Sequence, residues 1–154
     1  MDDLVYIRIR MALEDLNTAF THHLDHGRID ELVDLFTEDA VYTHGKRRSE
    51  GREAIRDLFN RRADAGVRTV RHMYSGLKLE IESESAARGT SVCLTFAYDG
   101  PPPATPATPH LVADFEDLYR KCADGKWRLA VRNIHRVFVA AENPGPVGHR
   151  TGRS

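Results

Sequence analysis

The chain has 154 residues, of which 41% are hydrophobic and 29% charged, proportions typical of a soluble globular domain. A domain of this size buries roughly two-thirds of its unfolded surface and can form its own core. Its 22 Lys and Arg nearly balance its 23 Asp and Glu, so a net charge of -1 provides no overall field to attract nucleic acid. Nucleic acid is therefore not an expected partner.

The apolar segments and the cysteines indicate a cytoplasmic protein. No apolar run approaches the ~20 residues that a membrane span needs. The first residues include two aspartates, Arg8 and Arg10, which is unlike a signal peptide. Cys93 and Cys122 have no spacing of a zinc or redox motif, so we expect reduced, structural thiols. No membrane partner is expected.

Three helices and a short strand are predicted in the N-terminal part of the chain. Residues 3–25 form the first helix, because their apolar residues recur every three or four positions: Ile9, Leu13, Leu16, Phe20 and Leu24. Asp30 is expected to cap a second helix, whose apolar side contains Leu32, Val33, Leu35 and Phe36. A short strand over 40–43 and a third helix over 51–65 follow.

From residue 67 the hydrophobic period changes to two, which is typical of half-buried strands. Strands are predicted over 67–74, 77–84, 89–98, 111–122 and 126–141, with a hairpin at Asp124-Gly125. The segment 100–109 contains five of the seven prolines and is expected to form an extended loop, a flap or an oligomer contact. We expect one domain over 1–141 and a flexible tail over 142–154.

The order of these elements predicts an α+β fold. A strongly curved sheet, antiparallel or mixed, would form a cone, and the three helices would pack on its concave side and enclose a pocket. Side chains from the end of the first helix and from the strands would converge on that pocket.

Several short strings resemble a known family in their order and spacing. They are residues 20–25 (FTHHLD), 35–40 (LFTEDA), 51–55 (GREAI), 71–74 (RHMY) and 125–129 (GKWRL). Together they resemble the SnoaL-like group of the nuclear-transport-factor-2-like superfamily, which has a cystatin-like cone fold. That group includes scytalone dehydratase, bile acid 7α-dehydratase, hexachlorocyclohexane dehydrochlorinase and polyketide cyclases.

The resemblance implies a set of site residues. Asp25 and His72 match the aspartate and histidine that face each other in the dehydratase and dehydrochlorinase branch, and Arg132 matches an arginine that holds substrate or leaving group. The dehydrochlorinase also has a lysine on its first helix, where this chain has Phe20 and Thr21. The resemblance implies no metal or organic cofactor, and a homodimer or homotrimer.

These residue types suit proton transfer. Imidazole titrates near neutrality and can act as a general base, while a carboxylate bonded to one ring nitrogen fixes the tautomer and leaves the other nitrogen free. Strand parity places Val70, His72 and Tyr74 on one face. Tyr42 and Tyr74 are candidate substrate-binding residues that could protonate a leaving oxygen, with wall positions as the alternative.

Two features of the candidate site stay open from the sequence. Arg128 and Arg136 share the parity of Arg132, and a bulge in this strand would exchange the two sets of residues. His22 and His26 have the i, i+4 spacing of a zinc pair, but no further ligands complete a site, so no metal is expected.

The leading hypothesis is a cofactor-independent lyase, of dehydratase or dehydrohalogenase type, that acts on a small cyclic or polyketide-like molecule. An isomerase or cyclase using the same base is one alternative. A non-catalytic protein is another, either a ligand-binding cone or a relative of the β subunit of ring-hydroxylating dioxygenases. Because one fold hosts many functions, the fold itself does not choose among them.

Overall fold

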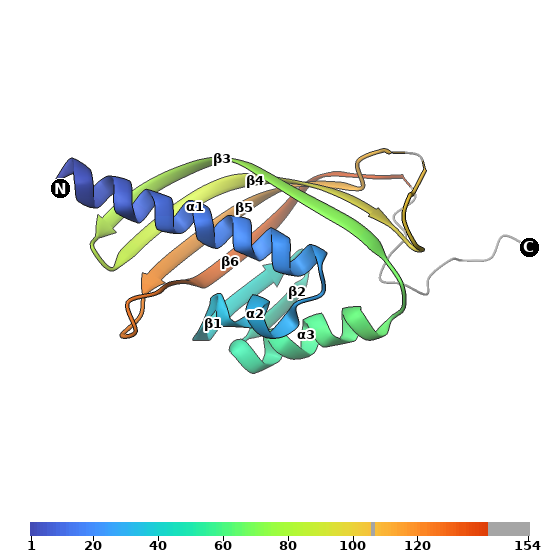
Figure 1. Ribbon diagram of the computed structural model, residues 1–154, viewed down its shortest axis with the longest axis horizontal. Coiled ribbons are helices and arrows are strands. Elements are labelled where there is room, and N and C mark those ends of the chain that lie inside the picture. The colour runs from blue at the N-terminus through green and yellow to red at the C-terminus, as the bar shows by residue number, and fades with distance from the viewer. Residues whose placement is uncertain (106, 142–154) are drawn as a thin grey trace, which may run out of the picture.

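The computed structural model describes residues 1–105 and 107–141, and the tail predicted over 142–154 lies outside them. Figure 1 shows the arrangement of the elements. In chain order they are α1 (Asp3–Asp25), α2 (Ile29–Asp34), β1 (Phe36–His44), β2 (Arg47–Glu50), α3 (Arg52–Asp64), β3 (Thr69–Ser83), β4 (Ala86–Tyr98), β5 (Leu111–Lys121) and β6 (Trp127–Val139). No helix in this described part is long and apolar enough to cross a membrane.

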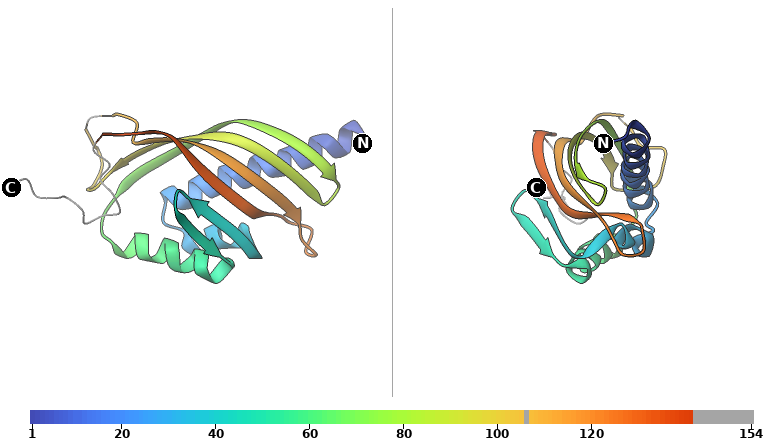
Figure 2. Two further views of the ribbon diagram at one scale, coloured as in Figure 1. Left: turned by 180° about the vertical axis from the view of Figure 1, so that it is seen from behind. Right: turned by 90° about the vertical axis from the view of Figure 1, so that its left-hand side faces the viewer.

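The strands form one mixed sheet with the order β2-β1-β6-β5-β4-β3. β1 and β6 pair in parallel, and the other neighbouring strands pair antiparallel. The long strands curve around α1, while α2 and α3 lie beside β1 and β2 (Figures 1 and 2). The α+β cone with helices on its concave side is therefore confirmed.

The apolar face of α1 forms one wall of the core. Leu13 and Phe20 are essentially inaccessible, and Phe20 makes edge-on ring contacts with Phe36 and Phe115. Leu58 and Phe59 of α3 are also buried, and Phe59 packs against Tyr42 of β1. Burial of such side chains contributes about 1.5–3 kcal/mol each. This core holds α1 across the sheet with its C-terminal end at the wide part of the cone.

The strand register arranges the inward side chains in rows across the concave face. Because directly paired residues share a face, His72, Thr95 and Leu111 form one row near the wide end. Further toward the narrow end, Gly89, Asp117, Arg132 and Tyr42 form another row. The rows place His72 and Arg132 at different depths of the cone.

Three local predictions were wrong. The predicted strands 67–74 and 77–84 form the single strand β3, because Gly76 adopts a positive φ of 68° and the register shifts there without a turn. Asp30 does not cap α2 but lies in its first turn. β1 begins at Phe36 rather than at Ala40, and β2 was not predicted.

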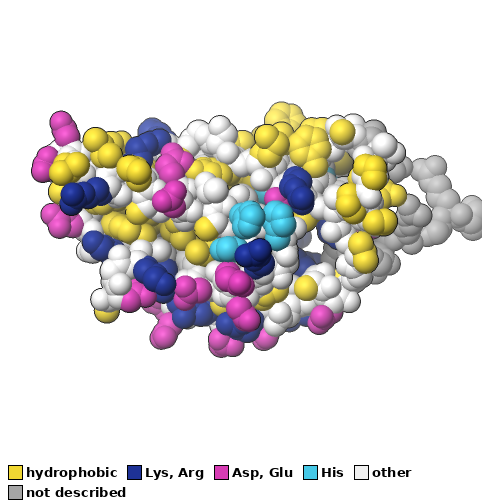
Figure 3. Space-filling view, in the orientation of Figure 1, with side chains coloured by type: hydrophobic (Ala, Val, Ile, Leu, Met, Phe, Trp, Pro, Cys, Tyr) yellow, Lys and Arg dark blue, Asp and Glu magenta, His cyan; other side chains and the backbone are white. Residues whose placement is uncertain are grey.

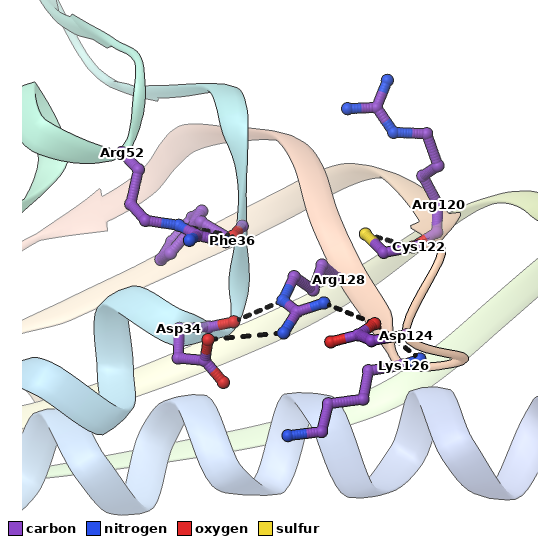
Figure 4. Close-up of polar contacts among 8 residues, drawn as sticks. All are labelled: Asp34, Phe36, Arg52, Arg120, Cys122, Asp124, Lys126 and Arg128. Carbon is purple, nitrogen blue, oxygen red and sulfur yellow. Dashed lines mark hydrogen bonds and ion pairs between the residues drawn. The ribbon is translucent and has the colours of Figure 1, made fainter.

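Arg128 joins the end of α2 to the β5–β6 hairpin (Figure 4). Its Nε donates to the carbonyl oxygen of Asp34 at 2.8 Å, and its Nη1 donates to Asp124 Oδ1 at 2.9 Å. The Arg128 guanidinium and the Lys126 backbone N–H hold the pKa of Asp124 at about 2. The predicted hairpin at Asp124-Gly125 is thus confirmed, and its tip is fixed against the α2 end.

Candidate active site

A cavity of about 560 Å³ lies at the wide end of the cone. Its walls come from the C-terminal ends of α1 and α3, the β1–β2 turn, the first residues of β3 and β5, and the far end of β6. Figure 3 shows a group of histidine side chains at the C-terminal end of α1, with a hollow beside it. A pocket of this size is adequate for a small organic molecule.

Asp25 and His72 meet in this cavity. Asp25 Oδ1 lies 2.6 Å from His72 Nδ1, and the side chains are only 6% and 16% exposed. The same carboxylate accepts the backbone N–H of His72, at 3.0 Å to Oδ2 and 3.2 Å to Oδ1. A carboxylate only accepts, so this geometry puts the ring proton on Nδ1 and leaves Nε2 as the basic nitrogen.

The local sequence explains this meeting. Asp25 is the last residue of α1, and Gly27, with φ of 67°, lets the chain turn away immediately after it. Val70, His72 and Tyr74 alternate with exposed neighbours, as strand parity predicted, and the first two line the cavity. One short helix end and one strand face therefore fix both members of the pair.

The two candidate tyrosines lie in different surroundings. Tyr42 is buried and lines a second hollow of about 40 Å³, which extends further into the core and shares His72 and His44 with the main cavity. Tyr74 does not line either hollow; its hydroxyl donates to Glu14 of α1. Burial and the bond to Glu14 raise the pKa of Tyr74 to about 12. The geometry therefore supports a site position for Tyr42 but not for Tyr74.

Arg132 belongs to a polar cluster in the core and does not line the cavity. Its Nε and Nη2 donate to Asp117 Oδ1 and Oδ2, both at 2.8 Å, and Nη2 also donates to Asn17. The guanidinium stacks between the rings of Phe20 and Phe115, at 4.3 Å from each centroid, and is fully buried. Burial opposes its charge, but Asp117 offsets this and raises the pKa of Arg132. The predicted substrate contact of Arg132 is thus not supported.

Two further histidines face the cavity without being prominent in the sequence. His44 ends β1, and His110 follows the proline-rich segment. Burial, followed by the charges of Arg62 and Arg136, lowers the pKa of His44 to about 4. Burial and then Arg68 also lower the pKa of His110. Both rings are consequently neutral near pH 7 and can donate or accept a hydrogen bond.

The lowered pKa of His44 predicts a pH-dependent stability. In the unfolded chain, His44 is protonated below its ordinary pKa of 6.5. In the folded protein it stays neutral down to about pH 4. Stability should therefore fall as the pH drops through this window. After allowance for solvent screening of this partly exposed group, we expect the free energy of unfolding to fall by about 1–2 kcal/mol over this pH range.

Denaturant unfolding at several pH values will check this expectation. The His44→Gln variant should show a shallower decline between pH 6.5 and pH 4, and the remaining slope should include the contribution of His110. An identical slope in both proteins would contradict the assignment.

The structure offers no evident metal cage in its described part. His22 and His26 stack with their ring centroids 4.3 Å apart, and His26 Nδ1 lies 2.8 Å from the carbonyl oxygen of His22. Among the described residues, no group of three or more His, Cys, Asp or Glu side chains could hold a metal ion. Cys93 and Cys122 are both free thiols, and burial raises the pKa of Cys93 to about 11.

The curved sheet, the covering helices and the cavity at the wide end define a cystatin-like, or nuclear-transport-factor-2-like, fold. The chain belongs to the SnoaL-like domain family, whose model matches residues 6–133. No sequence among the curated proteins matches it.

Solved structures share this fold at low sequence identity. A scytalone dehydratase-like protein from Novosphingobium aromaticivorans is 24% identical, with a TM-score of 0.78, and the match covers 94% of this chain and 96% of that one. Hexachlorocyclohexane dehydrochlorinase LinA-type3 from Novosphingobium barchaimii is 20% identical, with a TM-score of 0.73, over 90% and 93% of the two chains.

A third solved structure contains a small molecule. It is a Catenulispora acidiphila protein in complex with S-DNPA, 24% identical, with a TM-score of 0.73, and the match covers 84% of this chain and 94% of that one. At these identities the three likenesses establish the fold.

Proposed function

We propose that this protein is a cofactor-independent lyase, of dehydratase or dehydrohalogenase type, that acts on a small cyclic or polyketide-like molecule. His72 is the general base and Asp25 is its positioning residue. The observation that carries the proposal is the 2.6 Å contact between Asp25 Oδ1 and His72 Nδ1 inside a preformed cavity. Two structural neighbours, named as a scytalone dehydratase-like protein and a dehydrochlorinase, support this class of reaction.

The reaction needs one proton to leave carbon. Nε2 of His72 takes the proton from a carbon next to the one that bears the leaving group, and the C–H electron pair becomes the new double bond. The C–X bond breaks, and halide leaves as an anion, or hydroxide leaves with a proton as water. The imidazolium that forms is stabilised by Asp25, which stays ionised.

The cavity supports the transfer electrostatically. His72 and Asp25 are largely shielded from water, which strengthens their interaction. For a hydroxyl leaving group, the His72 imidazolium can return the proton, or Tyr42 of the inner hollow can donate one. A general base of this type contributes about 10²- to 10⁴-fold in rate, and orientation in the cavity supplies more.

Product analysis tests the proposal. Hydroxylated and halogenated cyclic compounds would be incubated with the protein in D₂O and analysed by mass spectrometry and NMR. Loss of water or hydrogen halide, absent with His72→Gln, supports a lyase. A product that loses neither water nor halide but gains deuterium at carbon would indicate an isomerase. Ligands that bind without loss of mass or exchange would indicate a binding protein and contradict the proposal.

A further inference from the structure

The charged side chains that line the cavity have mainly one sign. Within the described lining, five side chains are cationic (Lys46, Arg47, Arg62, Arg68 and Arg136), whereas the only carboxylate is Asp25. Asp25 is engaged by His72. The chain as a whole has a net charge of -1, so this concentration of positive charge is local.

Arg62 and Arg136 reach the cavity from two different elements, α3 and β6. In residues 1–105 and 107–141, neither forms an ion pair, and the same is true of Lys46 and Arg47 in the β1–β2 turn. Arg62 is half-buried on α3, with its guanidinium carbon 5.3 Å from the centre of the Phe59 ring. By contrast, Arg68 lies 4.0 Å from Asp99, which partly neutralises it.

These two arginines converge near the candidate base. Arg62 comes from α3 and Arg136 from the far end of β6, yet both line the cavity that contains Asp25 and His72, and Arg62 also lines the inner hollow. His44 and His72 line both hollows as well. Both arginines thus line the same cavity as the Asp25–His72 pair.

We propose that the substrate carries a carboxylate, which Arg62 and Arg136 bind while the reacting carbon faces His72. This inference rests on the proposed function for the reacting end, but not for the anion site itself. Arg62 is half-buried and Arg136 is exposed at the rim, but both line one cavity. A carboxylate in that cavity can accept charge-assisted hydrogen bonds from both guanidinium groups. A small cyclic acid meets the requirements of charge and size.

A matched pair of ligands tests the anion site. 2-Naphthoate and 2-naphthamide have nearly the same shape, but only the acid is charged at about pH 7. Calorimetric titration should show that wild type binds the acid about 10- to 100-fold more tightly than the amide. Arg62→Gln and Arg136→Gln should each weaken binding of the acid by about tenfold or more and leave binding of the amide unchanged.

Arg71→Gln is the control, because Arg71 is exposed on the outer face of β3 and does not line the cavity. Equal affinity for acid and amide would overturn the inference, as would an Arg71→Gln variant that loses as much affinity as the other two. Failure of every carboxylate from benzoate to 2-naphthoate to bind would also overturn it.

The binding assay separates this inference from the proposed reaction, since it needs no turnover. If acids bind through Arg62 and Arg136 but no compound loses water or halide, the anion site stands and the lyase proposal fails. If elimination depends on His72 but the amide binds as well as the acid, the reaction stands and the anion site is wrong.

Discussion

Replacement of His72 by glutamine is expected to lower kcat/KM for an elimination substrate by about 10²- to 10⁴-fold. Glutamine can keep a hydrogen bond to Asp25, but it cannot accept a proton at neutral pH. The backbone N–H of His72 donates to Asp25 and is unaffected by the substitution, so the strand and the helix end should stay joined. The loss should therefore appear in the rate, with little change in the free energy of unfolding.

His135→Gln provides a matched histidine control. His135 lies on β6 with its side chain 60% exposed and outside both hollows. We expect this variant to retain wild-type kcat/KM. Asp25→Asn should lose activity as well and change the pH profile, because the amide no longer stabilises the imidazolium. A His72→Gln variant that retains activity within a few-fold would contradict the role of this residue.

Arg132→Met is expected to destabilise the protein by about 3–5 kcal/mol, because it leaves the Asp117 carboxylate buried without its cationic partner. Arg132 and Asp117 are both fully inaccessible and share two hydrogen bonds of 2.8 Å. Tyr119 also donates to Asp117 at 2.7 Å, but a neutral hydroxyl cannot replace the guanidinium charge. Denaturant unfolding of the two proteins will measure the difference.

Two further variants separate a core role from a substrate role. Arg132→Met combined with Asp117→Leu removes both charges and should recover much of the lost stability, since a buried ion pair gains little over apolar packing. Arg136→Met, on the same face of β6 but exposed, should change the free energy of unfolding by less than about 0.5 kcal/mol. If Arg132→Met is as mild as Arg136→Met, the core assignment is wrong.

Strong periodicity made most of the fold predictable from sequence. The bounds of α1 match the prediction, because one apolar stripe and a glycine end define that helix. β3 was divided wrongly, since Gly76 is equally compatible with a turn and with a bulge inside a strand, and only pairing with β4 decides between them. β2 was missed because it consists of polar residues, which show no alternation of apolar and polar positions, and only its pairing with β1 defines it.

The candidate site was predictable from sequence at the positions that lie in motifs resembling the SnoaL-like family. The structure brings Asp25 and His72 together as the resemblance implied. The sequence could not show which arginine of β6 faces the pocket, because the face on which each side chain lies depends on bulges in the strand. A register shift near Ala130 moves Arg128 out of the set of side chains that face inward. Arg136, four residues beyond Arg132, is the arginine of β6 that lines the cavity.

The cationic lining could not be foreseen for a related reason. Arg62 and Arg136 lie far apart in the sequence, and each has the pattern of a solvated surface residue. His110 follows a proline-rich segment that has no hydrophobic period. Only the closing of the cone brings these side chains to one cavity.

The tautomer of His72 tests the central claim most directly. A two-bond ¹⁵N–¹H correlation spectrum of the uniformly labelled protein, at a pH where this ring is neutral, distinguishes the two ring nitrogens. The 2.6 Å contact with Asp25 predicts a protonated Nδ1 and an unprotonated Nε2, and this preference should weaken in Asp25→Asn. A proton on Nε2 would leave the cavity without the proposed base and contradict the account.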